Sequence, residues 1–196
     1  MSIVCAVRKN NEIAISADSL TSYGALRASS RHLKNSGKLY KVNGSVIGIV
    51  GWNAVSGIIE HLILRDKKIF QLGGRMEIMS TLLELHERMK DDYFLKTFED
   101  RDQPVESIQL QALVVNREGL FEINSYREVN EYLTFWAMGS GKRLALGAMH
   151  ALYDQGMSAK AVAEAGVRAA SEFDDSCSLP LKSRVIRDSE LKAVVA

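Results

Sequence analysis

The chain has 196 residues, of which 46% are hydrophobic and 25% are charged, a balance typical of a soluble globular fold. The formal net charge of +1 gives no electrostatic reason to expect binding to nucleic acid or to a membrane surface. No apolar run approaches the roughly 18 residues that a transmembrane helix needs, and the N-terminus does not resemble a signal peptide. We therefore expect residues 1–196 to form a single domain in the cytoplasm.

The cysteines, histidines and glycine-rich turn predict no cofactor and no metal. Cys5 and Cys177 are too few for a disulfide framework, and two free thiols fit a reducing cytoplasm. The histidines show no metal-ligand spacing with the cysteines. The turn at residues 139–141 (GSG) lacks the third glycine at the offset that a dinucleotide-binding loop requires.

The first 51 residues predict strands. Residues 3–7 are apolar at every position, which indicates a strand buried on both faces. The polar stretch 19–37 predicts mostly loop with weak extended structure. Asn43-Gly44 between two apolar runs is a strong hairpin signal. The strands expected in this part of the chain are 3–7, 13–17, 38–42 and 45–51.

Helical periodicity begins after residue 51. Five apolar residues follow the i, i+3, i+4, i+7, i+8 pattern of one helix face, and four more after the Gly73-Gly74 break, at i, i+4, i+7 and i+11, share one face of a second helix. These positions are Val55, Ile58, Ile59, Leu62 and Ile63, and then Ile78, Leu82, Leu85 and Met89. Later strands are expected at 110–115, 120–124, 132–138, 183–187 and 190–195, with helices at about 142–154 and 158–173.

The order of these elements predicts the fold class. Two pairs of helices have strands before, between and after them, whereas a doubly wound parallel sheet needs strands and helices to alternate singly. We therefore expect an α/β (α+β) fold in the form of a four-layer α/β/β/α sandwich.

The start of the chain carries the first chemical signal. Methionine aminopeptidase acts beside a residue as small as Ser2, so removal of Met1 would give Ser2 a free α-amine. Such an amine has a pKa of roughly 8 and can act as a general base toward the hydroxyl of the same residue. The buried strand that follows at once would hold this nucleophile in place. An inert, processed terminus is the alternative that the two residues alone leave open.

Two charged residues are expected near this terminus. Asp18 ends the second predicted strand and Lys38 begins the third, so antiparallel pairing could bring both close to Ser2. A lysine beside an amine and a hydroxyl favours the deprotonated nucleophile, and Asp18 would keep that lysine charged and oriented. A hairpin-end ion pair of little energetic weight is the other interpretation.

Several motifs together resemble proteasome β subunits and HslV, the peptidase ring of a two-component bacterial protease. SIVCAVRKNNEIAISAD resembles the family's opening, in which the nucleophile and an aspartate are separated by fifteen residues. KLYKV resembles the strand headed by the catalytic lysine, SVIGIVG the next strand, and MGSG the turn before the third helix. RAASEFDDSCS occupies the place of the family's Asp-x-x-Ser element. The resemblance covers essentially the whole chain.

The resemblance implies roles for ten residues. The nucleophile would be Ser2, with Lys38 as the cation that lowers its pKa and Asp18 as the residue that orients the lysine. Gly48 would donate its backbone N–H to the oxyanion, as such donors do in acyl transfer. A supporting hydrogen-bond network and a medium apolar substrate pocket complete the site. The network residues are Ser140, Asp175 and Ser178, and the substrate-binding residues are Ser22, Val46 and Val50.

The chain departs from the family pattern at three places. Serine replaces the usual threonine nucleophile and lacks the methyl group that restricts χ1. The segment between Asp18 and Lys38 is longer than in the family, and Lys34 aligns if no gap is allowed. We favour Lys38 because KLYKV repeats the apolar alternation. Asp174 competes with Asp175, and only Asp175 gives Asp-x-x-Ser.

The function that the resemblance implies is peptide-bond hydrolysis through an acyl-enzyme at Ser2. The active enzyme would be a homo-oligomer of stacked rings with about 12 to 14 subunits in all. Its substrates would be peptides or unfolded proteins, with an ATP-dependent unfoldase as a possible partner and with no nucleic acid or membrane. Two alternatives stay open: an inactive or unprocessed ring that acts as a scaffold, and a small-molecule amidase of the same nucleophile class.

Overall fold

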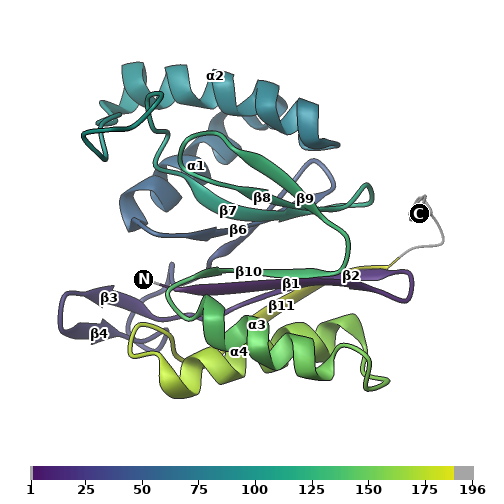
Figure 1. Cartoon of the computed structure of the whole chain (residues 1–196). Coiled ribbons are helices and arrows are strands. Elements are labelled where there is room, and N and C mark those ends of the chain that lie inside the picture. Colours follow the sequence, from purple (N-terminus) through teal and green to yellow (C-terminus); the bar gives the residue numbers. More distant parts are fainter. Residues whose placement is uncertain (1, 188–196) are drawn as a thin grey trace.

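The computed structural model describes residues 2–187, so the strand predicted at 190–195 lies outside the described residues. Two antiparallel sheets pack face to face, and a pair of helices covers the outer face of each sheet (Figure 1). This arrangement confirms the predicted four-layer α/β/β/α sandwich. None of the helices between residues 2 and 187 contains a stretch long and apolar enough to traverse a bilayer.

The first sheet carries the N-terminus. Its strand order is β10-β1-β2-β11, and all neighbours are antiparallel. Every residue from Ile3 to Val7 is fully buried, because the sheet has helices on one face and the second sheet on the other. The strands are β1 (Ile3–Lys9), β2 (Glu12–Ala17), β10 (Phe135–Gly139) and β11 (Lys182–Arg187).

The second sheet has the order β5-β6-β7-β8-β9, in which each strand pairs with its sequence neighbour. Its predicted hairpin turns at Asn43-Gly44, where both residues have positive φ angles of 47° and 79°. The strands are β5 (Leu39–Val42), β6 (Ser45–Val50), β7 (Gln111–Val115), β8 (Leu120–Ile123) and β9 (Val129–Tyr132).

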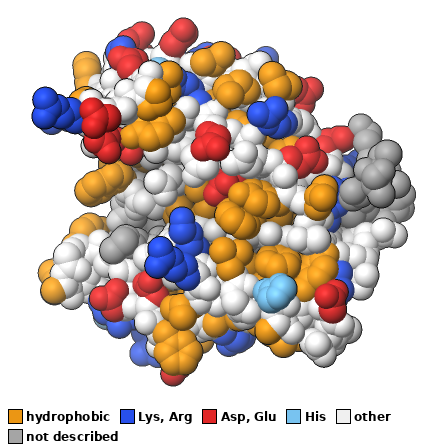
Figure 2. Space-filling model, in the orientation of Figure 1, with side chains coloured by type: hydrophobic (Ala, Val, Ile, Leu, Met, Phe, Trp, Pro, Cys, Tyr) orange, Lys and Arg blue, Asp and Glu red, His pale blue; other side chains and the backbone are white. Residues whose placement is uncertain are grey.

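Two helical layers enclose the sheets. The second sheet packs on α1 (Asn53–Asp66), the short 3₁₀ helix η1 (Lys67–Ile69) and α2 (Arg75–Tyr93). The first sheet packs on α3 (Lys142–Leu152) and α4 (Ala159–Phe173). The hydroxyl of Ser158 accepts a hydrogen bond from the backbone N–H of Ala161 and caps α4, as its sequence position predicts. Basic and acidic side chains are interspersed on the face shown in Figure 2.

Two segments differ from the sequence-based expectation. The single strand predicted at 132–138 is two strands, because the chain leaves the second sheet after β9 and enters the first sheet as β10. Tyr132 and Trp136 stack across this crossing with ring centroids 4.2 Å apart.

The predicted loop at 19–37 contains a short hairpin of β3 (Thr21–Tyr23) and β4 (Leu26–Ala28). Strands of three residues are too short for an alternation pattern to reveal them.

The two sheets approach each other closely at Gly48 in β6. A Cβ atom at this position would lie 2.6 Å from Cγ1 of Val4 and 3.0 Å from Cδ1 of Ile15, both on the first sheet. The absence of a side chain at Gly48 therefore sets the spacing between the layers at this point.

Replacing Gly48 by Ala should lower the free energy of unfolding by about 1–3 kcal/mol, because the added methyl group overpacks the contact between the sheets. The matched control is Gly57→Ala in α1, where a Cβ atom would meet nothing within 4 Å. The control should raise the same free energy by about 0.5–1 kcal/mol, since alanine is the better helix former. Urea unfolding followed by circular dichroism measures both, and equal shifts would contradict the close contact.

Candidate active site

A buried ion pair lies at the end of the first sheet. Asp18 directly follows β2 and its side chain has 0% exposure, whereas Lys38 directly precedes β5 with 10% exposure. The Lys38 Nζ is 2.6 Å from Oδ1 of Asp18 and donates to the carbonyl of Leu20 at 2.8 Å. Burial lowers the pKa of Lys38, and the negative charge of Asp18 opposes this shift.

The carboxylate of Asp18 also receives three backbone N–H groups. Ile3 donates to Oδ1 at 3.0 Å, while Leu20 and Ser178 donate to Oδ2 at 3.0 and 3.3 Å. Hydrogen bonds to a charged acceptor are stronger than neutral ones and fix its orientation. Asp18 therefore joins the residue after Ser2, the lysine and the loop after α4 into one unit.

Ser2 is held from its other side by the turn after β10. The side chain and backbone of Ser2 together are only 6% exposed, and its carbonyl accepts the backbone N–H of Ser140 at 3.0 Å. Gly139 has a φ of +116°, and a Cβ atom there would lie 1.9 Å from the carbonyl oxygen of Ser2. Only glycine allows this approach. The start of β1 is thus fixed on both sides rather than frayed.

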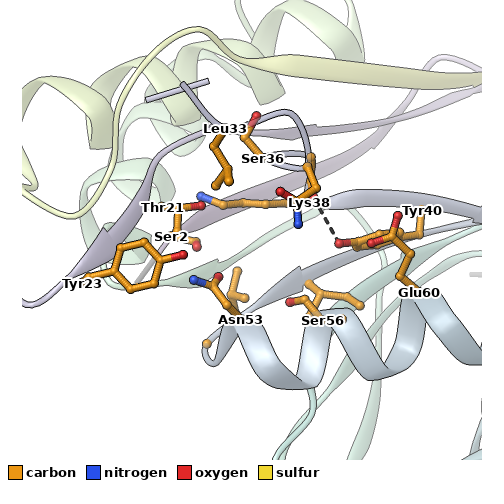
Figure 3. A pocket seen from close by; sticks show the side chains of 16 residues that line it. Ser2, Thr21, Tyr23, Leu33, Ser36, Lys38, Tyr40, Asn53, Ser56 and Glu60 are labelled. Atoms are coloured by element: carbon orange, nitrogen blue, oxygen red, sulfur yellow. Dashed lines mark hydrogen bonds between the residues drawn. The ribbon is translucent and has the colours of Figure 1, made fainter. Parts of the chain in front are cut away.

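A cleft of about 90 Å³ opens in front of Ser2. Figure 3 shows Ser2, Thr21 and the Lys38 ammonium close together at one part of it, with Asn53, Ser56 and Glu60 of α1 facing in from the other layer. The lining residues are Ser2, Thr21, Tyr23, Leu33, Asn35, Ser36, Gly37, Lys38, Tyr40, Ile49, Val50, Gly51, Asn53, Ser56, Gly57 and Glu60.

The structure separates the two rival lysines. Lys38 points into the cleft and pairs with Asp18, whereas Lys34 is exposed in the loop that precedes it. The alternation of apolar and polar residues that follows Lys38 is that of β5, so Lys38 lies directly before this strand. From there its side chain reaches Asp18. The geometry therefore agrees with the preference for Lys38.

The network around Ser140 differs from the one that the sequence favours. The Ser140 hydroxyl donates to the carboxylate of Asp174 at 3.1 Å, and the carboxylate of Asp175 accepts from its neighbour Ser176 instead. The hydroxyl of Ser178 donates to the carbonyl of Leu179, so Ser178 contributes to the site through its backbone N–H. The preference for Asp175 and the role of the Ser178 hydroxyl are corrected accordingly. The cause is the tight turn after α4, whose side-chain directions the spacing alone does not define.

The thiol of Cys177 lies where the Ser178 hydroxyl was expected. Its Sγ is 3.8 Å from the hydroxyl oxygen of Ser140, and burial raises the pKa of this thiol to about 12. Burial also raises the pKa of the Cys5 thiol well above its usual value. Both cysteines are therefore neutral at physiological pH and poor nucleophiles.

Gly48 does not fit the predicted role of oxyanion donor. Backbone N–H groups alternate between the two neighbours of a strand, and the N–H of Ile49 donates to the carbonyl of Lys38 on the β5 side. The N–H of Gly48 therefore faces β7, and Gly48 is absent from the cleft lining. Gly51, which directly follows β6, lines the cleft instead.

The predicted substrate-binding residues divide between the cleft and the core. Val50 lines the cleft, but Val46 is buried in the core between the sheets. Alternation along β3 places Thr21 and Tyr23 in the cleft lining and leaves Ser22 out of it. The predictions for Val46 and Ser22 are corrected on this ground. The polar residues contributed by α1 had no signal in the sequence, because they lie on the face opposite its apolar stripe.

No group of three or more His, Cys, Asp or Glu side chains within residues 2–187 is arranged to hold a metal ion. The residues that line the cleft instead include Ser2 with its hydroxyl, Lys38 with its ammonium and the backbone of Gly51. This set can support attack by a hydroxyl on a carbonyl carbon, with an N–H available for the resulting oxyanion.

Known proteins share this fold along almost the whole chain. A structure of Thiobacillus denitrificans BPH is 34% identical, has a TM-score of 0.88 and covers 94% of this chain and 97% of that one. The same protein in complex with epoxomicin is also 34% identical, with a TM-score of 0.86 over 97% of this chain and 100% of that one. No family model matches the chain.

Two HslV proteins are more distant. The ATP-dependent protease subunit HslV of Lactiplantibacillus plantarum is 26% identical over 177 residues, which are 87% of this chain and 88% of that protein. Eukaryotic HslV from Trypanosoma brucei is 22% identical with a TM-score of 0.69, covering 95% of this chain and 99% of that one, and shares the fold.

Replacing Lys38 by Met should lower the free energy of unfolding by about 3 kcal/mol or more, because it leaves Asp18 buried without its cation. The control Lys34→Met removes an exposed lysine and should stay within about 0.5 kcal/mol of the parent protein. Chemical unfolding at pH 7 compares the two. Equal stability of the two variants would show that Asp18 and Lys38 do not form the pair seen here.

Proposed function

Because the chain belongs to the proteasome β-subunit and HslV-like family of N-terminal-nucleophile hydrolases, we propose that it is a peptidase subunit whose nucleophile is the Ser2 hydroxyl. Removal of Met1 creates the free α-amine that this chemistry requires. The observation that carries the proposal is the position of Ser2, which is fixed at the cleft beside the Asp18–Lys38 pair.

The proposed reaction forms and then hydrolyses an ester on Ser2. The Ser2 amine takes the hydroxyl proton as Oγ attacks the peptide carbonyl, and the N–H of Gly51 stabilises the oxyanion of the tetrahedral intermediate. The amine returns this proton to the leaving nitrogen as the C–N bond breaks. A water molecule then attacks the acyl-enzyme ester with the same amine as base, which releases the carboxylic acid and restores Ser2.

Lys38 has two tasks in this proposal. Its ammonium disfavours a second positive charge nearby, so the Ser2 amine is neutral and able to accept a proton near pH 7. The same ammonium stabilises negative charge as it develops on Oγ. Asp18 orients the ammonium, and Ser140 with Asp174 positions the start of the chain. Asp175 and Ser178 support this turn through Ser176 and Asp18.

We further propose that the subunits form stacked homo-oligomeric rings that enclose the clefts and work with an ATP-driven unfoldase. Large apolar side chains are exposed on several elements, including Tyr23 (61%), Trp52 (71%) and Phe94 (86%), as expected of surfaces that other subunits cover. The name of the Lactiplantibacillus plantarum relative, an ATP-dependent protease subunit, supports the same assembly. Native mass spectrometry tests it, and a monomeric mass would contradict it.

The purified protein should lack Met1 by intact-mass measurement, and a peptide epoxyketone should add one inhibitor mass per subunit on Ser2. Epoxyketones form a ring with both the hydroxyl and the amine of an N-terminal nucleophile, so labelling requires both groups. Epoxomicin bound to Thiobacillus denitrificans BPH supports the choice of probe. Ser2→Ala should abolish labelling and lower peptide cleavage at least about 1,000-fold.

The control is Ser80→Ala, which removes an exposed hydroxyl of α2 and should change neither result. Retained Met1 together with unlabelled Ser2 would contradict the proposed nucleophile. A mature but unreactive Ser2 would instead favour a scaffold, and a reactive Ser2 that cleaves only small amides would favour an amidase.

The pH dependence of kcat/KM should be bell-shaped. The rate should rise as the Ser2 amine loses its proton and fall as the Lys38 ammonium loses its own. Because burial lowers the pKa of Lys38, the fall should begin below the usual value of 10.5 for lysine. In Lys38→Met the amine loses a neighbouring positive charge, so its pKa and the rising limb should shift to higher pH. A rising limb at the same pH in both proteins would show that Lys38 does not tune the amine.

A further inference from the structure

The cleft continues past Ser2 along one face of α1. Asn53, Ser56, Gly57 and Glu60 follow the i, i+3, i+4, i+7 spacing that places side chains on the same face of a helix, and all four line the cleft. Asn53 is at the end next to Ser2, and Glu60 lies beside Tyr40 at the opposite end (Figure 3). Seven residues of helix separate these two ends by about 10 Å.

Small residues leave the middle of this channel open. Ser36 and Gly37 line it from the segment before β5, and Ser56 and Gly57 line it from α1. A Cβ atom at Gly57 would meet nothing within 4 Å. A long, narrow side chain can therefore pass between the two layers from Ser2 toward Glu60.

The far end of the channel carries an uncompensated negative charge. Within residues 2–187 the ion pairs do not include Glu60, and Lys38 is the only cation of the described lining. The Lys38 ammonium is already engaged by Asp18 and by the carbonyl of Leu20. The half-buried carboxylate of Glu60 is thus available to a cation that enters the channel.

Tyr40 forms the wall of the channel beside Glu60. Its hydroxyl donates to the carbonyl of Gly37 at 3.1 Å, so the ring is held in place. Burial and the negative charge of Glu60 together raise the pKa of this phenol to about 12. Tyr40 therefore stays neutral at physiological pH and adds no charge of its own to the channel.

We propose that this channel selects lysine or arginine at the residue whose carbonyl Ser2 attacks, with Glu60 as the residue that recognises the cationic end. The inference rests on the proposed peptidase function and names its substrate class. It replaces the medium apolar pocket expected from Val46 and Val50, because Val46 is in the core and the far end of the cleft is acidic. Two physical features support this choice. The long aliphatic part of a lysine or arginine side chain fits the open channel, and its cationic end is attracted to the carboxylate of Glu60.

The test compares three fluorogenic peptides that differ only in the residue before the reporter, which is arginine, leucine or glutamate. The parent protein should cleave the arginine peptide with the highest kcat/KM. Glu60→Gln should lower kcat/KM for this peptide by about tenfold or more and change the leucine peptide less than about threefold. Glu60→Lys should make the glutamate peptide better than the arginine peptide. Glu87→Gln, an exposed glutamate of α2, is the matched control and should change nothing.

A second variant tests the channel itself. Gly57→Leu narrows the channel at a position where its Cβ atom would meet nothing within 4 Å, so the variant should fold and still cleave a peptide with alanine at the same position while losing the arginine peptide. Equal cleavage of all peptides by the parent protein, or no effect of Glu60→Gln, would overturn this inference and leave the peptidase function intact. Failure to cleave any peptide and to label Ser2 would overturn the function and this inference together.

Discussion

The carboxylate of Asp18 organises the site. It accepts the Lys38 ammonium and the backbone N–H groups of Ile3, Leu20 and Ser178, which come from four separate segments of the chain. A charge that is fully buried is tolerable only with this many donors around it. The same bonds that satisfy Asp18 therefore fix the lysine and the start of β1 relative to each other, and the reactivity proposed for Ser2 depends on that arrangement.

Close contacts of the backbone at two glycines add to the constraints that the ion pair places on the site. Gly139 lets the turn after β10 contact the carbonyl of Ser2, and Gly48 lets the two sheets meet near the same end of the sandwich. Both positions exclude a side chain for steric reasons, although only Gly139 has a positive φ angle. The consequence is that Ser2, the proposed nucleophile, is held directly at the start of the rigid strand β1, which favours the alignment that acyl transfer needs.

The two halves of the sandwich contribute different parts of the cleft. The start of β1 and the segment before β5 supply Ser2 and Lys38, while the turn after β6 supplies Gly51 and α1 supplies the face that ends at Glu60. The proposed nucleophile Ser2 and the proposed recognition group Glu60 thus come from different layers. Substitutions on the α1 face can therefore alter which side chain enters without disturbing the bonds around Asp18.

The sequence by itself determined the layer order and the buried strand β1, because apolar periodicity is a local property of the chain, and it favoured Lys38 over Lys34 as the lysine near Asp18. It did not determine that Asp174 and not Asp175 contacts Ser140, that Gly51 and not Gly48 lines the cleft, or that Glu60 lies at the far end of the cleft. These depend on the direction of each N–H and side chain once the two layers have packed. Spacing along the chain sets which residues can be near the site, and only the tertiary structure decides which of them point into it.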